Sequence, residues 1–176
     1  MRSKYKIIDN EQIYFVTSTI VQWVPIFTSE KYFQILINSL NFSVEKQNLE
    51  IYAWVIMDNH FHLVCSSPNI SSIIQGIKRY TAKRIITQLK YDNKNWLLNL
   101  FKYYKATYKR NSKYQVWQEG FHPKMIINEE MFRQKIEYIH YNPVRRGLVA
   151  KPEDWLYSSA KFFLSGEESL VKLSEF

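Results

Sequence analysis

Two hydrophobic patterns alternate along the first half of the chain and predict its elements. Residues 13–19, 49–57 and 60–66 are rich in β-branched and aromatic residues, which favour strands. After a hydroxyl and acid start at 28–30, apolar residues recur at helical spacing up to about residue 47. A second long helix is expected after the capping residues of 69–72, with a stripe of isoleucines ending at Leu89.

The second half of the chain has a weaker pattern. Residues 114–117 read as the next strand, and 124–127 continue it after a bend. A third helix begins at Asn128, and Pro143 is expected to end it at or before Asn142, because proline disfavours a helical conformation in the residue that precedes it. A short terminal helix or docked segment follows from Lys151.

This order of elements predicts an α+β fold. Strand, helix, strand, strand, helix, strand and then further helix is the order of a ferredoxin-like split βαβ antiparallel sheet with helices packed on one face. In that layout the strands at 13–19 and 60–66 are central neighbours. We expect one domain over 1–176 with a core of about 13–163, a variable insertion at 92–113 and a peripheral tail at 165–176. Residues 1–12 are expected to be poorly ordered.

Composition narrows the class of protein. The chain has 176 residues, of which 46% are hydrophobic, and a net charge of +8. Aromatic residues interleaved with lysine and arginine favour a nucleic-acid partner over a membrane surface. The longest apolar runs fall far short of a membrane span, and no basic and apolar leader opens the chain, so we expect a cytoplasmic protein. The single cysteine, Cys65, is expected to be an ordinary core residue.

Two histidines on one predicted strand are the first candidate site. Side chains alternate along a strand, so His60 and His62 face one way and Phe61 the other. Two imidazoles in this arrangement are able to hold one divalent ion. The alternative is that both are half-buried polar residues of a hairpin.

Cations on the second predicted helix are a candidate DNA-binding surface. Lys78, Arg79 and Lys83 lie off the isoleucine stripe, beside the histidine hairpin, and phosphate contacts are the expectation for the group. For any one of them, a solvated helix flank is the simpler interpretation.

A tyrosine on the third predicted helix is a candidate nucleophile. Tyr138 and Asn142 are four residues apart and therefore point the same way. Two histidines, an amide and a tyrosine suggest metal-assisted transfer at phosphorus with a tyrosine oxygen as nucleophile. The chain has 13 tyrosines, so spacing alone does not select one.

Four segments carry a resemblance to a known family. They are DNHFHLV at 58–64, WQEGFH at 117–122, EYIHYNPVRRGLV at 137–149 and the stretch 155–160. In this order they resemble the REP-associated tyrosine transposases, which are single-tyrosine HUH nucleases similar to the small transposases of single-strand insertion sequences. The resemblance runs from about residue 13 to residue 163.

The resemblance implies a reaction and the residues that perform it. His60 and His62 would bind Mg²⁺ or Mn²⁺, with Asn142 as the further polar ligand. Tyr138 would be the nucleophile, forming a 5′-phosphotyrosine link to cleaved single-stranded DNA and leaving a free 3′-OH. Tyr141 is the alternative nucleophile, and simple helix packing is the preferred interpretation for it.

The resemblance also implies a DNA partner. The family recognises imperfect DNA hairpins beside a short single-stranded guide, and the candidates for backbone contacts here are Arg79, Lys83, Arg145 and Arg146. His122 matches a family histidine and is expected to support the site rather than to bind metal. Related enzymes act either as homodimers that exchange the tyrosine helix or as monomers, and the sequence leaves both open.

Two other classes of function remain at this point. The same basic, aromatic-rich sheet would suit a module that binds DNA or RNA without cutting it, and such binding would be independent of metal. A metal-dependent phosphodiesterase that uses water would cleave DNA without becoming attached to it.

Overall fold

The computed structural model describes residues 7, 9, 12–109 and 111–175. Its strands are β1 (Tyr14–Thr19), β2 (Glu50–Ile56), β3 (His60–Ser66) and β4 (His122–Met125). The helices are α1 (Glu30–Lys46), α2 (Ile70–Tyr91), α3 (Asn95–Tyr103), α4 (Glu129–Arg145) and α5 (Ala160–Ser165), with short 3-10 turns η1 (Val21–Trp23) and η2 (Pro152–Asp154). The expectation for residues 1–12 falls mostly outside the described residues.

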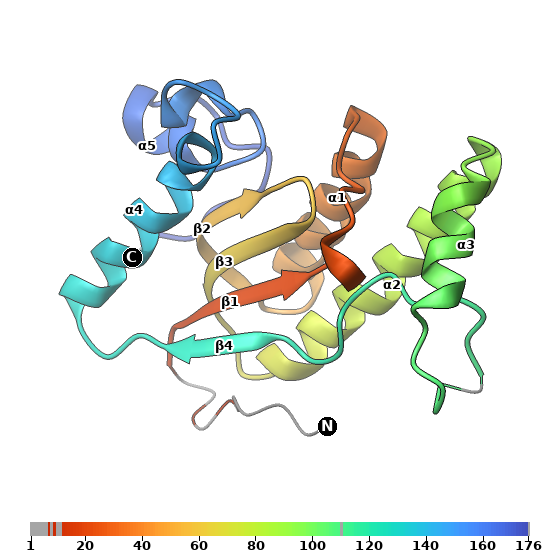
Figure 1. The fold of residues 1–176 in the computed structure, drawn as a ribbon. Helices are drawn as coiled ribbons and strands as arrows, with labels where there is room; N and C mark the ends of the chain where they lie inside the picture. Colours follow the sequence, from red (N-terminus) through yellow and green to blue (C-terminus); the bar gives the residue numbers. More distant parts are fainter. Residues whose placement is uncertain (1–6, 8, 10–11, 110, 176) are drawn as a thin grey trace.

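The four strands form one antiparallel sheet in the order β2-β3-β1-β4 (Figure 1). The predicted α+β fold with a split βαβ order is confirmed, and β1 and β3 are the central neighbours. Their register places Thr17 opposite His62 and Thr19 opposite His60. Because paired residues point to the same face, these side chains share one face of the sheet with Phe15.

Helices α1 and α2 cover the other face. The alternate positions of β1 and β3, which include Val16, Phe61 and Leu63, pack there into the main core. Ile74, Ile77 and Ile85 of α2 belong to the same core, so the predicted isoleucine stripe is buried. Cys65 is also fully buried in it. This core fixes the sheet against two antiparallel helices behind it (Figure 1).

The expectation that helices lie on one face is wrong for α4. Phe132 and Ile139 of α4 form a second core with Val55 and Val64, which lie on the histidine face. A single apolar stripe on α4 and an apolar flank beside the histidines bury each other. The sheet is therefore sandwiched between α1 and α2 on one side and α4 on the other.

The predicted strand at 114–117 is wrong. Within this stretch Trp117 makes only an isolated bridge to Ile20, and β4 begins at His122, inside the predicted bend. Trp117 is 4% exposed and its Nε1 donates to Thr81 Oγ1 (3.0 Å), so the stretch is anchored by its side chains against α2. Side-chain burial, rather than strand pairing, produced the β-like pattern.

Pro143 does not end the third helix. α4 continues through it to Arg145, and Arg146 N donates to Asn142 O (3.1 Å). A proline removes one helical hydrogen bond, and here this loss falls in the last turn, where few bonds remain to be made. Gly147, at φ +68°, then ends the helix.

The predicted insertion and the predicted peripheral tail both contribute buried residues. The insertion at 92–113 contains α3, which lies beside α2, and Phe101 of α3 is fully buried. The tail after 165 is docked rather than peripheral. Val171 is fully buried, and Ser174 N donates to Ile51 O (2.8 Å).

Ser159 joins α4 to β2, and its removal gives a test of this fold. Its Oγ accepts from Trp54 N (3.0 Å) and shares a hydrogen bond with His140 Nε2 (3.0 Å), and all three residues are buried. Ser159→Ala leaves buried polar groups without partners, so we expect a loss of about 1–3 kcal/mol in the free energy of unfolding. Urea denaturation checks this. The exposed Ser165→Ala is the control, and an equal effect of both variants contradicts the role given to Ser159.

Candidate active site

The two histidines of β3 lie side by side on the α4 face of the sheet. His60 and His62 are 6% and 5% exposed, and their ring centroids are 4.7 Å apart. The strand period of two residues, together with the register against β1, places them there. The pair that the sequence predicted on one face is therefore present.

Each imidazole is oriented through its Nδ1 atom. His62 Nδ1 lies 2.7 Å from Thr17 Oγ1, and His60 Nδ1 lies 2.7 Å from Asn59 Oδ1. The Asn59 amide nitrogen donates to Trp23 O (3.0 Å), which leaves Oδ1 as the atom that faces His60. His60 Nδ1 must then carry the proton, so His60 Nε2 has a free lone pair.

Burial keeps both rings neutral. Burial, with a smaller effect from Arg146, lowers the pKa of His60 to about 4, although Asp58 opposes the shift. Burial and then His60 and Lys135 hold the pKa of His62 well below its ordinary value. Neutral imidazole is the form that binds metal ions.

Tyr138 of α4 comes into contact with His62 of the same chain. Its ring lies edge-on to the His62 ring, with centroids 5.4 Å apart, and edge-on to Phe15 at 5.7 Å. Phe15 in turn stacks on His62 at 5.0 Å. Tyr138 is 39% exposed, so it is held by its ring while remaining open to solvent.

Asn142 lies one helical turn beyond Tyr138 on α4 and is 6% exposed. Arg146, a further turn along, forms an ion pair with Asp58 (3.3 Å), which lies in the turn before the His60 strand. Tyr138 thus lies beside β3 at His62, and Arg146 lies beside the turn that precedes His60. Asn142 lies between these two contacts on α4.

This arrangement fits a divalent ion. His62 Nε2 is buried and has no hydrogen-bond partner among the described residues, which is costly for a polar atom and suits a ligand atom. No group of three His, Cys, Asp or Glu residues able to hold a metal occurs in the part of the chain that the structure describes. A site here would thus consist of the two histidines and an amide oxygen, with DNA or water oxygens completing it.

A known protein family matches most of this chain. The family described as "Transposase IS200 like" matches residues 19–142, a span that includes the histidine pair, Tyr138 and Asn142. The chain belongs to this family.

Two curated relatives are proteins named as REP-associated tyrosine transposases. One, from Haemophilus influenzae, is 28% identical over 126 residues, covering 66% of this chain and 65% of the relative. The other, from Escherichia coli K12, is 24% identical over 110 residues, covering 62% of this chain and 53% of the relative. The matches thus span less than two thirds of each relative's length.

A solved structure has the same fold. It is that of a REP-associated tyrosine transposase bound to a REP hairpin, with a TM-score of 0.68 and 20% identity over 99% of this chain and 93% of that one. At this level of identity the likeness concerns the fold alone.

Four other predicted site residues lie on β4 and at the C-terminal half of α4, around the histidine pair. Tyr141 is 44% exposed and, three residues beyond Tyr138 on α4, is turned about 60° away from it. His122 of β4 pairs with Thr17, so it lies on the histidine face at the edge of the sheet. The Arg145 guanidinium lies 5.3 Å from the centroid of the Tyr138 ring. The next arginine, Arg146, forms an ion pair with Asp58.

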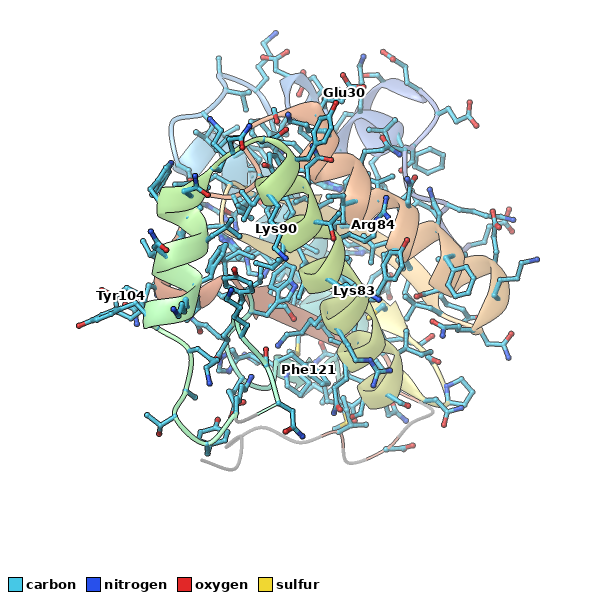
Figure 2. The ribbon with its side chains drawn as sticks, turned by 90° about the vertical axis from the view of Figure 1, so that its right-hand side faces the viewer. Glu30, Lys83, Arg84, Lys90, Tyr104 and Phe121 are labelled. Carbon is cyan, nitrogen blue, oxygen red and sulfur yellow. The ribbon has the colours of Figure 1, made fainter. Side chains whose placement is uncertain are left out.

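Arg79 and Lys83 lie on the opposite side of the sheet. They line a groove of about 810 Å³ between α2 and the loop 109–120, and Figure 2 views this side of the molecule. Its other cations are Lys78 and Lys90 of α2 and Lys109 and Lys113 of the loop, of which Lys109 forms an ion pair with Glu119. Lys90 and Lys113 each lie within 6 Å of the Tyr114 ring centroid, at 5.9 and 5.5 Å. The helix and the predicted insertion thus contribute to one basic groove.

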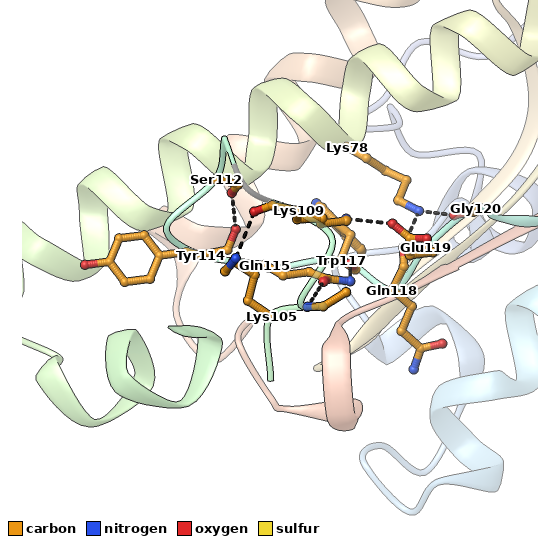
Figure 3. A network of polar contacts seen from close by, with 11 residues as sticks. Lys78, Lys105, Lys109, Ser112, Tyr114, Gln115, Trp117, Gln118, Glu119 and Gly120 are labelled. Carbon is orange, nitrogen blue, oxygen red and sulfur yellow. Dashed lines mark hydrogen bonds and ion pairs between the residues drawn. The ribbon is translucent and has the colours of Figure 1, made fainter. Parts of the chain in front are cut away.

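Lys78 is not on the surface as expected. It is 9% exposed, and its Nζ donates to Gln118 O (2.8 Å) and to Gly120 O (Figure 3). Burial, with a smaller effect from Lys109, lowers its pKa to about 8. The aliphatic part of Lys78 extends the isoleucine stripe, and its ammonium ties the 118–120 loop to α2.

Thr17 and Asn59 were missed as site residues. Asn59 lies in the motif at 58–64 and Thr17 in the predicted strand at 13–19, but neither position by itself indicates a contact with a histidine. The register of β1 against β3 is what assigns Thr17 to His62, and a sequence alone does not give this register.

The buried nitrogen of His62 leads to a stability prediction. In metal-free buffer, His62→Phe should change the free energy of unfolding little, because the loss of the hydrogen bond to Thr17 is offset by the removal of an Nε2 atom without a partner. His140→Phe should lower the free energy of unfolding by about 1–3 kcal/mol, since it breaks the buried hydrogen bond to Ser159 with no such offset. Urea denaturation with a chelator measures both. An equal loss in the two variants would contradict this difference.

Proposed function

We propose that the chain is a metal-dependent transesterase that cleaves and rejoins single-stranded DNA. The Tyr138 oxygen attacks a backbone phosphorus, the bond from phosphorus to the 3′ oxygen breaks, and a 5′-phosphotyrosine link forms. The phenol loses its proton, and the departing 3′ oxygen gains one. In the rejoining step a 3′-OH attacks the same phosphorus and the tyrosine is released.

His60, His62 and Asn142 would hold Mg²⁺ or Mn²⁺, which polarises the phosphate and stabilises the charge that develops there. Thr17 and Asn59 hold the Nδ1 atoms of the two rings, which would leave the Nε2 atoms to bind the ion, as outer partners do in metal sites. The mixed nitrogen and oxygen donors suit Mn²⁺ at least as well as Mg²⁺.

The contact between Tyr138 and His62 carries this proposal. A nucleophile must lie next to the group that activates its target, and this tyrosine ring is packed against the imidazole whose Nε2 has no partner. Since both residues come from one chain, a monomer is sufficient for the reaction.

A covalent adduct tests the nucleophile. With a labelled hairpin oligonucleotide and Mn²⁺, the protein should form a DNA adduct that survives a denaturing gel, and Tyr138→Phe should form none. Tyr141→Phe is the matched control and should retain most of the adduct. An adduct in Tyr138→Phe contradicts the assignment, and cleavage without any adduct indicates attack by water.

Mixing two inactive variants tests whether one chain is enough. A mixture of Tyr138→Phe and His62→Phe should remain inactive if each tyrosine serves its own histidines. Recovery of adduct in the mixture would mean that the tyrosine serves a partner subunit.

We propose further that the basic groove binds the duplex stem of a DNA hairpin. The relative of known structure holds a REP hairpin, and here cations from α2 and from the 109–113 segment converge on one groove. Stem phosphates are the natural partners of such a groove.

Charge removal in the groove tests this assignment. Arg79→Gln and Lys83→Gln should each weaken hairpin binding and reduce its salt dependence by about 0.9 in log–log slope per lost contact. Binding of an unpaired strand should change less. Lys161→Gln, which removes the same charge from α5, is the control. Equal effects of all three variants would show only a dependence on net charge.

A further inference from the structure

Two lysines lie beside Phe15, on the face of the sheet that carries the histidines. Lys124 of β4 pairs with Phe15, so its side chain leaves the sheet on the histidine face. Lys135 of α4 lies over the same face, with Nζ 5.0 Å from the centroid of the Phe15 ring and 5.6 Å from that of Tyr138. The edge strand and the helix that follows it thus each place one cation beside Phe15.

Neither lysine forms an ion pair with a carboxylate in the described part of the chain, whereas Lys31, Lys109, Arg133, Arg146 and Lys161 do. Burial, and secondarily the charge of Lys124, lower the pKa of Lys135. A bound anion would favour the charged form of both lysines.

We propose that Lys124 and Lys135 form a binding site for a backbone phosphate of the single strand, next to the phosphate that Tyr138 attacks. This inference rests on the proposed function.

The order of side chains along α4 supports the position. Lys135, Tyr138, Asn142 and Arg146 follow one another along the helix, with His62 beside Tyr138 and Asp58, just before His60, beside Arg146. The lysines therefore lie beyond the tyrosine, on the side away from His60. A strand whose reacting phosphate lies at Tyr138 and His62 would place a neighbouring phosphate over Phe15. Holding that phosphate would align the strand for attack.

Neutralising single phosphates tests the site directly. A set of unpaired oligonucleotides, each with one methylphosphonate in place of a phosphate, is bound to the protein without metal. For wild type, one position beside the cleavage point should weaken binding. In Lys135→Gln and in Lys124→Gln that same replacement should have no further effect, and each variant should lower the salt slope by about 0.7.

The matched control is Arg133→Gln, which removes the same charge from the same helix but from an exposed residue paired with Glu129. It should keep the full sensitivity to every methylphosphonate. The proposal is overturned if Lys135→Gln responds to each replacement as wild type does, or if Arg133→Gln loses the same response. Because this readout is binding, a failure of adduct formation would sink the transesterase assignment while leaving this result interpretable.

Discussion

The pairing of β1 with β3 is the constraint on which the site depends. It places Thr17 opposite His62 at the centre of the sheet and so fixes the free nitrogen of that ring toward α4. A slip of one residue would turn the threonine and Phe15 into the main core and would leave the imidazole without its partner. The helices behind the sheet hold β1 in this register through Val16, which such a slip would turn out of the main core.

The second half of the site comes from the docking of α4. Its apolar residues pack on the flank of the histidine face, and Arg146 binds Asp58 at the turn between β2 and β3. These two contacts fix the position of α4 along the strands and its rotation about its own axis. The tyrosine is thereby placed against His62, and the amide of Asn142 lies one turn further along the same helix.

Those parts of the fold and of the site that depend on local sequence patterns could be predicted from the sequence. The strands at 60–66 and 13–19, the start of α1 and the histidine pair follow from periodicity and capping, and the motif order indicated the family. What failed depends on tertiary context. Trp117 resembles a strand residue, but its side chain is buried against α2. Lys78 appears to be exposed in the sequence, but the 118–120 loop covers it. Pro143 appears to end a helix, but α4 continues through it because this part of the helix is packed on the sheet. The cover on both faces of the sheet, and the lysine pair at Phe15, arise from contacts between distant segments.

The C-terminal segment has a consequence for how molecules of this protein meet. Tyr157 and Ser159 exchange hydrogen bonds with Ile56 and Trp54, and Ser174 reaches Ile51, so the outer peptide groups of β2 are occupied by the chain itself. An uncovered edge strand invites a neighbouring copy to extend the sheet, which is a common route to aggregation. The C-terminal residues therefore cover the β2 edge of the sheet, and this cover disfavours self-association through β2.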